Sequence, residues 1–124
     1  MNNKITSLKE KFRVALTSTA KVISEDFTLK NGKLENSNTY EIDDIKNPND
    51  FIRMRADTDS EALKKKFSNN LIHKKNLPSN STLRVLYDIA EKVRCESLGG
   101  QMLKGIEKNF NKNYSLMINL KKKD

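Results

Sequence analysis

Residues 47–63 read NPNDFIRMRADTDSEAL, and this stretch decides the fold. Asn47 is a favoured helix cap, Pro48 is favoured at the first helical position, and Asp50 stabilises the first turn. Apolar side chains then recur at helical spacing, so the pattern predicts one helix from Pro48 to about His73. The side chains that form this apolar face are Phe51, Ile52, Ala56, Leu63, Phe67 and Leu71.

The residues before this stretch predict a second helix and a small insertion. Apolar residues recur with a helical period over 5–23, and Ser7 and Glu10 have the spacing of a capping box. From residue 24 to 46 this period is lost, and the Asn-Gly dipeptide at 31–32 favours a tight turn. We therefore expect an irregular or β-hairpin insertion at about 24–46.

The residues after the stretch predict one or two more helices. Residues 83–93 carry a wide apolar face, which predicts the most buried element of the fold, with Ser79 or Ser81 as its cap. The glycine pair at 99–100 either ends this helix or allows another part of the chain to approach closely. Helical spacing then continues over 102–110.

The composition agrees with one small helical domain. The chain has 124 residues, of which 35% are hydrophobic, and it contains no Trp, so it can form one modest core. We predict a mainly α fold of three to four helices with a small irregular or β-hairpin insertion. Residues 1–113 form the helical domain in this prediction, and residues 114–124 form a Lys-rich tail. A single Cys and the lack of an apolar signal region or membrane-length apolar run predict a cytoplasmic protein.

The charge is distributed unevenly along the chain. The formal net charge is +8, made up of +4 in residues 1–34, −5 in residues 35–61 and +9 in residues 62–124. This polarity suits docking to a charged partner or to an acidic ligand. Lys and Asn are both abundant, however, so a basic surface that is merely solvated is the alternative interpretation.

No catalytic or metal-binding constellation stands out. One His and one Cys do not make a zinc site, and no phosphate-binding loop motif occurs. His73 falls near a predicted helix end, where a structural or capping role is favoured and a partner contact is the alternative. Cys95 lies within an apolar helical pattern, which predicts a small core residue.

Several charged residues are spaced to form local helical pairs. Asp59 lies on the apolar stripe, where an acid needs a partner, and Arg55 four residues earlier can supply one. Arg84 and Asp88 are four residues apart, and a Glu lies three residues before Arg94. The residues predicted to have structural or partner-contact roles are Arg55, Asp59, His73, Arg84, Asp88, Arg94 and Glu96.

A longer pattern runs from residue 55 to residue 109, and we call its members the motif residues. They are Arg55, Asp59, Ser60, Ala62, Leu63, His73, Pro78, Arg84, Asp88, Arg94, Glu96, Gly99, Gly105 and Asn109. In order and spacing this pattern resembles the N-terminal region of the T subunit of the aerobic, ATP-dependent cobaltochelatase, over about residues 5–113. Tyr87 stands where that family's pattern has Phe.

The resemblance implies a function for the whole complex. The T subunit works with an AAA+ ATPase subunit and a large chelatase subunit to insert cobalt into hydrogenobyrinic acid a,c-diamide, during cobalamin biosynthesis. ATP, Mg and cobalt belong to that complex, and the resemblance implies no cofactor within this segment. The chain is then a non-catalytic assembly segment that packs against its own copies and against the ATPase ring. The D-x-S-x-S opening of the family's metal-dependent adhesion domain does not occur in these 124 residues.

The alternative prediction is a small basic helical protein that binds nucleic acid or has a regulatory role. Lysines 64–66 and 74–75 could contact phosphates. The few aromatic residues occupy predicted core positions, however, and Arg is scarce, so nucleic acid is the less favoured partner.

Overall fold

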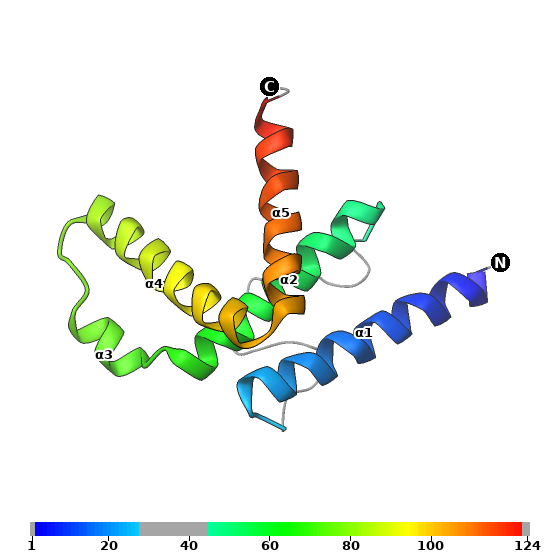
Figure 1. The fold of residues 1–124 in the computed structure, drawn as a ribbon, viewed down its shortest axis with the longest axis horizontal. Helices are drawn as coiled ribbons and strands as arrows, with labels where there is room; N and C mark the ends of the chain where they lie inside the picture. The colour runs from blue at the N-terminus through cyan, green and yellow to red at the C-terminus, as the bar shows by residue number, and fades with distance from the viewer. Residues whose placement is uncertain (1, 28–44, 123–124) are drawn as a thin grey trace.

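The computed structural model describes residues 2–27 and 45–122, and these residues form five helices and no strand. The mainly α fold class is therefore confirmed. Figure 1 shows helices that diverge from a shared centre. In chain order the helices are α1 (Asn2–Ser24), α2 (Pro48–Phe67), α3 (Asn70–Lys75), α4 (Ser81–Met102) and α5 (Lys104–Lys122).

The beginning of α2 follows the sequence prediction. The Asn47 side-chain oxygen accepts hydrogen bonds from the backbone N–H groups of Asn49 and Asp50, at 2.9 and 3.3 Å. The Asp50 carboxylate in turn accepts from the Asn47 N–H at 3.1 Å. This capping box satisfies backbone donors that the first helical turn leaves free.

The prediction of one continuous helix to His73 was wrong. α2 ends at Phe67, where Ser68 takes an extended backbone conformation. Asn69 then caps a separate helix, because its side chain accepts hydrogen bonds from the backbone N–H groups of Leu71 and the residue after it. A cap inside a continuous apolar pattern therefore adds α3 to the three to four helices predicted.

Two other predicted caps were also wrong. Ser7 lies within α1, which begins at Asn2, so it caps no helix. Asn80, rather than Ser79 or Ser81, caps α4 through its side-chain oxygen. Asn is at least as good a cap as Ser, and its position one residue before Ser81 gives it the first free backbone donors.

The predicted insertion at 24–46 lies mostly outside the described residues, which stop at 27 and resume at 45. At its start, Glu25 adopts a left-handed backbone conformation (φ 59°) that ends α1. The Glu25 carboxylate pairs with Lys66, and Asp26 pairs with Lys65. These two ion pairs join the end of α1 to the end of α2.

α2 forms the centre of the fold, and it contacts α1, α4 and α5. One cluster of buried side chains joins α2 to α1, α4 and α5, and a second joins α1 to the start of α2. In the second cluster, Phe12 and Phe51 pack edge to face with ring centroids 4.8 Å apart. The buried residues of α2 are Met54, Ala56, Thr58, Asp59, Ser60, Ala62 and Leu63.

The prediction that α4 is the most buried element was wrong, because α2 holds that place. Only the second half of α4 is buried, at residues 95, 96, 99 and 100. The first half extends beyond α2 toward α3 (Figure 1), and its four aliphatic side chains Leu83, Val85, Leu86 and Ile89 are more than half exposed. The glycine pair at 99–100 does not end the helix; Gly99 lies against the Leu63 side chain instead. At the other end of the fold, α5 continues through the predicted tail as far as Lys122.

Candidate functional site

A buried hydrogen-bond network joins α2, α4 and α5. The Ser60 hydroxyl donates to Glu96 Oε1 at 2.8 Å, and the Tyr114 hydroxyl donates to Glu96 Oε2 at 2.6 Å. Glu96 is only 8% exposed. Burial, together with the bond to Glu96, raises the pKa of the Tyr114 hydroxyl above its usual value. The network therefore holds a carboxylate between two neutral hydroxyl donors.

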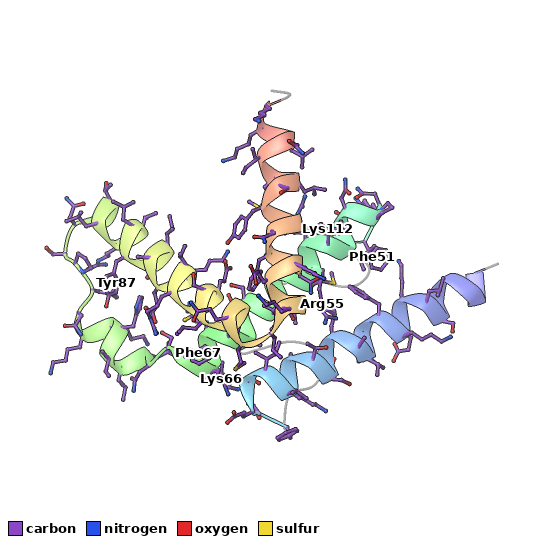
Figure 2. All side chains as sticks on the ribbon, viewed as in Figure 1. Phe51, Arg55, Lys66, Phe67, Tyr87 and Lys112 are labelled. Carbon is purple, nitrogen blue, oxygen red and sulfur yellow. The ribbon has the colours of Figure 1, made fainter. Side chains whose placement is uncertain are left out.

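A second buried carboxylate joins α2 to α5. Asp59 is fully buried, and its Oδ2 lies 3.3 Å from Arg55 Nε and 3.3 Å from Asn109 Nδ2. Burial raises the Asp59 pKa, while Arg55 and Asn109 act in the opposite direction. Figure 2 shows Arg55 near the crossing of α2 and α5. The structure thus brings together the Arg55 and Asp59 that the sequence predicted as a pair.

Arg94 joins α4 to the end of α2. Its Nη2 donates to the backbone carbonyl of Phe67 at 2.9 Å, and its guanidinium bonds both Glu91 oxygens at 2.6 and 2.9 Å. The guanidinium lowers the Glu91 pKa to about 2. Arg94 therefore satisfies one of the free carbonyls of the last α2 turn. Cys95 beside it is a buried core residue, as predicted, and burial raises the pKa of its thiol.

The outer end of α4 is tied to α3. His73, in the last turn of α3, lies 2.7 Å from Asp88, and its ring stacks on Tyr87 with centroids 4.6 Å apart. Arg84 Nε donates to the carbonyl of Pro78 at 2.6 Å. Arg84 thus bonds the loop before α4, and Asp88 bonds α3. The sequence had suggested instead that Arg84 and Asp88 pair with each other.

Many motif residues therefore contact one another across helices. Sequence reasoning missed these long-range partners and also missed Tyr114, which fell in the predicted tail. One local signal could have pointed to Tyr114: it follows the apolar Phe110 by four residues, so both lie on one helical face. The motif pairs are Ser60–Glu96, Asp59–Asn109, Leu63–Gly99, His73–Asp88 and Pro78–Arg84.

Beyond the network, α4 and α5 diverge from their junction (Figure 1), and apolar side chains remain exposed on both helices. A hollow of about 380 Å³ lies at the base, with Val93 and Gly100 on one wall and Phe110 and Tyr114 on the other. Outward from the hollow, α4 and α5 carry apolar side chains that are 37–57% exposed. We call this surface the apolar V; it comprises Leu86, Ile89, Val93, Tyr114, Met117 and Ile118.

The described ranges, 2–27 and 45–122, contain no group of three or more His, Cys, Asp or Glu side chains that could hold a metal ion. Within the same ranges, no helix is long and apolar enough to cross a membrane.

The fold and its contacts define an α-helical protein whose motif residues fix the packing of one helix on another. The chain belongs to the family described as Cobalamin biosynthesis protein CobT, whose model matches residues 6–123. This match confirms the resemblance to the N-terminal region of that family, and it places the chain in cobalamin biosynthesis. No curated protein and no solved structure matches the chain.

Proposed function

We propose that this chain is a non-catalytic assembly segment of a cobaltochelatase T subunit, acting in the cytoplasm. In this proposal it supports ATP-dependent insertion of cobalt into hydrogenobyrinic acid a,c-diamide. Its partners are the AAA+ ATPase subunit and the large chelatase subunit. ATP and Mg are bound by other parts of the complex, and cobalt is the metal substrate.

The observation that carries the proposal is the use of the motif residues. Ser60 with Glu96, and Asp59 with Asn109, bond one another inside the fold. Side chains that are committed to one another in this way maintain a shape rather than present reactive groups to a substrate. The family's characteristic residues thus preserve one arrangement of α2, α4 and α5, while apolar surface stays uncovered beside them.

The basic surface supports a protein partner more than a nucleic acid. Lys65 and Lys66, two of the three lysines at 64–66, are paired with Asp26 and Glu25. These pairs reduce the positive charge available for phosphates. The described aromatic residues Phe12 and Phe51 pack on each other rather than form a stacking platform for bases.

The proposal is tested by a pull-down of the 124-residue chain with the host's AAA+ chelatase subunit, with and without ATP. Light scattering then gives the stoichiometry of any complex. We expect a stoichiometric complex whose amount changes with nucleotide. Repeating the binding at about 1 M salt is the control, because non-specific attraction to lysines is screened there. A chain that stays unbound in every nucleotide state contradicts the assembly function.

A further inference from the structure

A second hollow, of about 390 Å³, lies where α2, α4 and α5 meet, and we call it the α2 hollow. It differs from the hollow at the base of the apolar V because α2 forms one of its walls. Its volume is at the small end of the range for ligand sites, roughly 300–1,000 Å³, so it can take a small molecule rather than a large cofactor. The residues around its deeper part are Ala56, Asp57, Glu96, Phe110, Asn113 and Tyr114.

Asn113 places an amide at a core position of α5. The buried residues of this helix are Ile106, Phe110 and Asn113, so two are apolar and the third is polar. Asn113 is only 5% exposed, and its Oδ1 accepts no hydrogen bond from the described part of the chain. Its Nδ2 lies 3.7 Å from the sulfur of Met117, which is a weak acceptor. Both ends of this buried amide therefore lack a strong partner, a condition that lowers stability unless another molecule bonds the amide.

A primary carboxamide is the group that matches the Asn113 side chain. It has N–H donors for Oδ1 and a carbonyl acceptor for Nδ2, so it can form two hydrogen bonds with the buried amide at once. Asp57, half-buried in the same wall, is an acceptor for the remaining N–H. Water also bonds an amide, but only a molecule with an aliphatic part gains from covering the apolar side chains of the wall. These are Ala56, Phe110 and Leu120.

The mouth of the α2 hollow is basic. Arg53, Lys92 and Lys121 line the hollow, and the two lysines are exposed. Lys92 lies 4.0 Å from Glu96, whose oxygens already accept two hydroxyl hydrogen bonds. The three cations outnumber the two carboxylates of the hollow, Asp57 and Glu96. The mouth therefore attracts an anionic group, while the deeper part offers hydrogen-bonding groups to a neutral one.

We propose that the α2 hollow binds a small aliphatic amido acid, a molecule with a primary carboxamide at one end and a carboxylate at the other. The carboxamide pairs with the Asn113 side chain, and the aliphatic chain packs on Phe110. The carboxylate faces Lys92 and Lys121 at the mouth. This inference goes beyond the proposed assembly function, which assigns the chain no small-molecule ligand, and it does not rest on that function.

The test titrates glutaramic acid, an amido acid with a short aliphatic chain, into the ¹⁵N-labelled 124-residue chain and follows the backbone amide signals by NMR. We expect saturable shifts centred on the residues that line the α2 hollow, with a dissociation constant in about the millimolar range for so small a ligand. Glutaric acid has a second carboxylate in place of the amide, and it should bind roughly tenfold more weakly. Glutaramide has a second amide in place of the carboxylate, and it should bind about threefold more weakly.

Two pairs of variants assign the two ends of the ligand. Asn113→Leu removes the amide partner and should weaken glutaramic acid binding roughly tenfold. Asn119→Leu is its control, because it makes the same change at an exposed position of α5 outside the hollow. Lys121→Gln should weaken binding about threefold, and Lys122→Gln, at the exposed neighbouring position outside the hollow, should leave it unchanged. Circular dichroism verifies that each variant is folded, and the Lys121 pair carries the test if Asn113→Leu does not fold.

Three outcomes would overturn the inference. Glutaramic acid that gives no saturable shift would mean that water alone occupies the hollow. Glutaric acid that binds as tightly as glutaramic acid would mean that charge alone attracts the ligand and that Asn113 recognises nothing. A control variant that weakens binding as much as its partner would place the ligand elsewhere. None of these results changes the outcome of the ATPase pull-down, so the two proposals fail separately.

Discussion

Ser60 and Glu96 lie 36 residues apart in the chain and share a buried hydrogen bond of 2.8 Å that joins α2 to α4. Tyr114 completes the contact from α5 at 2.6 Å. A carboxylate with two hydroxyl donors is satisfied although it is almost fully buried. This acid and its two hydroxyl partners therefore join α2, α4 and α5 at one point.

Replacing Tyr114 by Phe should test this contact. The variant leaves one Glu96 oxygen without its donor while keeping the ring, so we expect a loss of about 1–2 kcal/mol in unfolding free energy. Urea unfolding, followed by circular dichroism, measures it. Tyr87→Phe is the control, since the Tyr87 ring contacts His73 only by stacking. An unchanged midpoint for Tyr114→Phe would mean that the hydrogen bond contributes nothing net.

The same tyrosine should make stability depend on pH at the alkaline end. The Tyr114 pKa is raised in the folded chain above the ordinary value of 10. A raised pKa in the folded chain adds to the unfolding free energy. This contribution is complete below about pH 10 and is lost as pH rises through the folded pKa. We expect unfolding free energy to fall above about pH 10 in the wild type and to fall less in Tyr114→Phe. Parallel curves would contradict this linkage.

A side chain at position 99 should destabilise the fold, because Leu63 packs directly against Gly99. A Cβ at Gly99 would overlap the Leu63 methyl groups and lie 2.9 Å from its Cγ. Because Leu63 is fully buried, we expect Gly99→Ala to cost about 1–3 kcal/mol. Gly105→Ala is the control: no atom lies within 4 Å of its Cβ position, so helix propensity should leave it neutral or stabilising by up to about 1 kcal/mol.

A double-mutant cycle makes this prediction specific. In a Leu63→Ala background, the Gly99→Ala substitution enters the space that the leucine vacates, and its cost should largely disappear. Thermal unfolding of the four chains gives the coupling free energy. Additive effects would show that Gly99 is required for backbone reasons rather than for its contact with Leu63.

Removing Arg55 should lower the unfolding free energy, because the buried Asp59 carboxylate then lacks its cationic partner. The Asp59 carboxylate is fully buried 3.3 Å from Arg55, so we expect Arg55→Ala to destabilise the fold by roughly 3 kcal/mol at neutral pH. Burial already raises the Asp59 pKa, and losing Arg55 raises it further. The penalty for the variant should therefore shrink as pH falls through the raised Asp59 pKa, because the carboxyl then binds a proton and needs no cationic partner. Chemical unfolding over a series from neutral to acidic pH measures this penalty, and a penalty independent of pH would contradict the charge argument.

The sequence allowed prediction of those features that depend on near neighbours. The start of α2 was predictable because Asn47, Pro48 and Asp50 act within one turn, and the Arg55–Asp59 pair because four residues span one turn. The end of α2 at Phe67 was not predicted, because the apolar pattern continues across Asn69. There the Asn69 side chain caps a new helix, although the helical spacing of apolar residues is unbroken.

Long-range partners could not be predicted in this way. Nothing local to Glu96 marks Ser60 as its donor, and nothing local to Asp88 marks His73. The burial of α4 was misjudged for the same reason: its apolar face predicts contact, but it does not say how much of that face the described residues cover. A wide apolar face on one helix predicts contact without specifying which molecule supplies it.

Glu91 offers the last prediction, at the acidic end of the pH range. Arg94 lowers its pKa from 4.5 to about 2 in the folded chain. A lowered pKa in the folded chain adds to the unfolding free energy. This contribution is present above about pH 4.5 and is lost as pH falls toward about 2. Glu91→Gln should therefore be less stable than the wild type at pH 7, and the two chains should converge over that window.

The matched control is Glu107→Gln, because Glu107 pairs with Lys104 at 3.7 Å on an open surface where that lysine is 86% exposed. An exposed pair contributes little, so this variant should follow the wild type at every pH. Urea unfolding at neutral pH and at about pH 3 separates the two cases. Equal stability of Glu91→Gln and wild type at both pH values would mean that the Arg94 contact with the Phe67 carbonyl, and not the charge on Glu91, holds α4 against the end of α2.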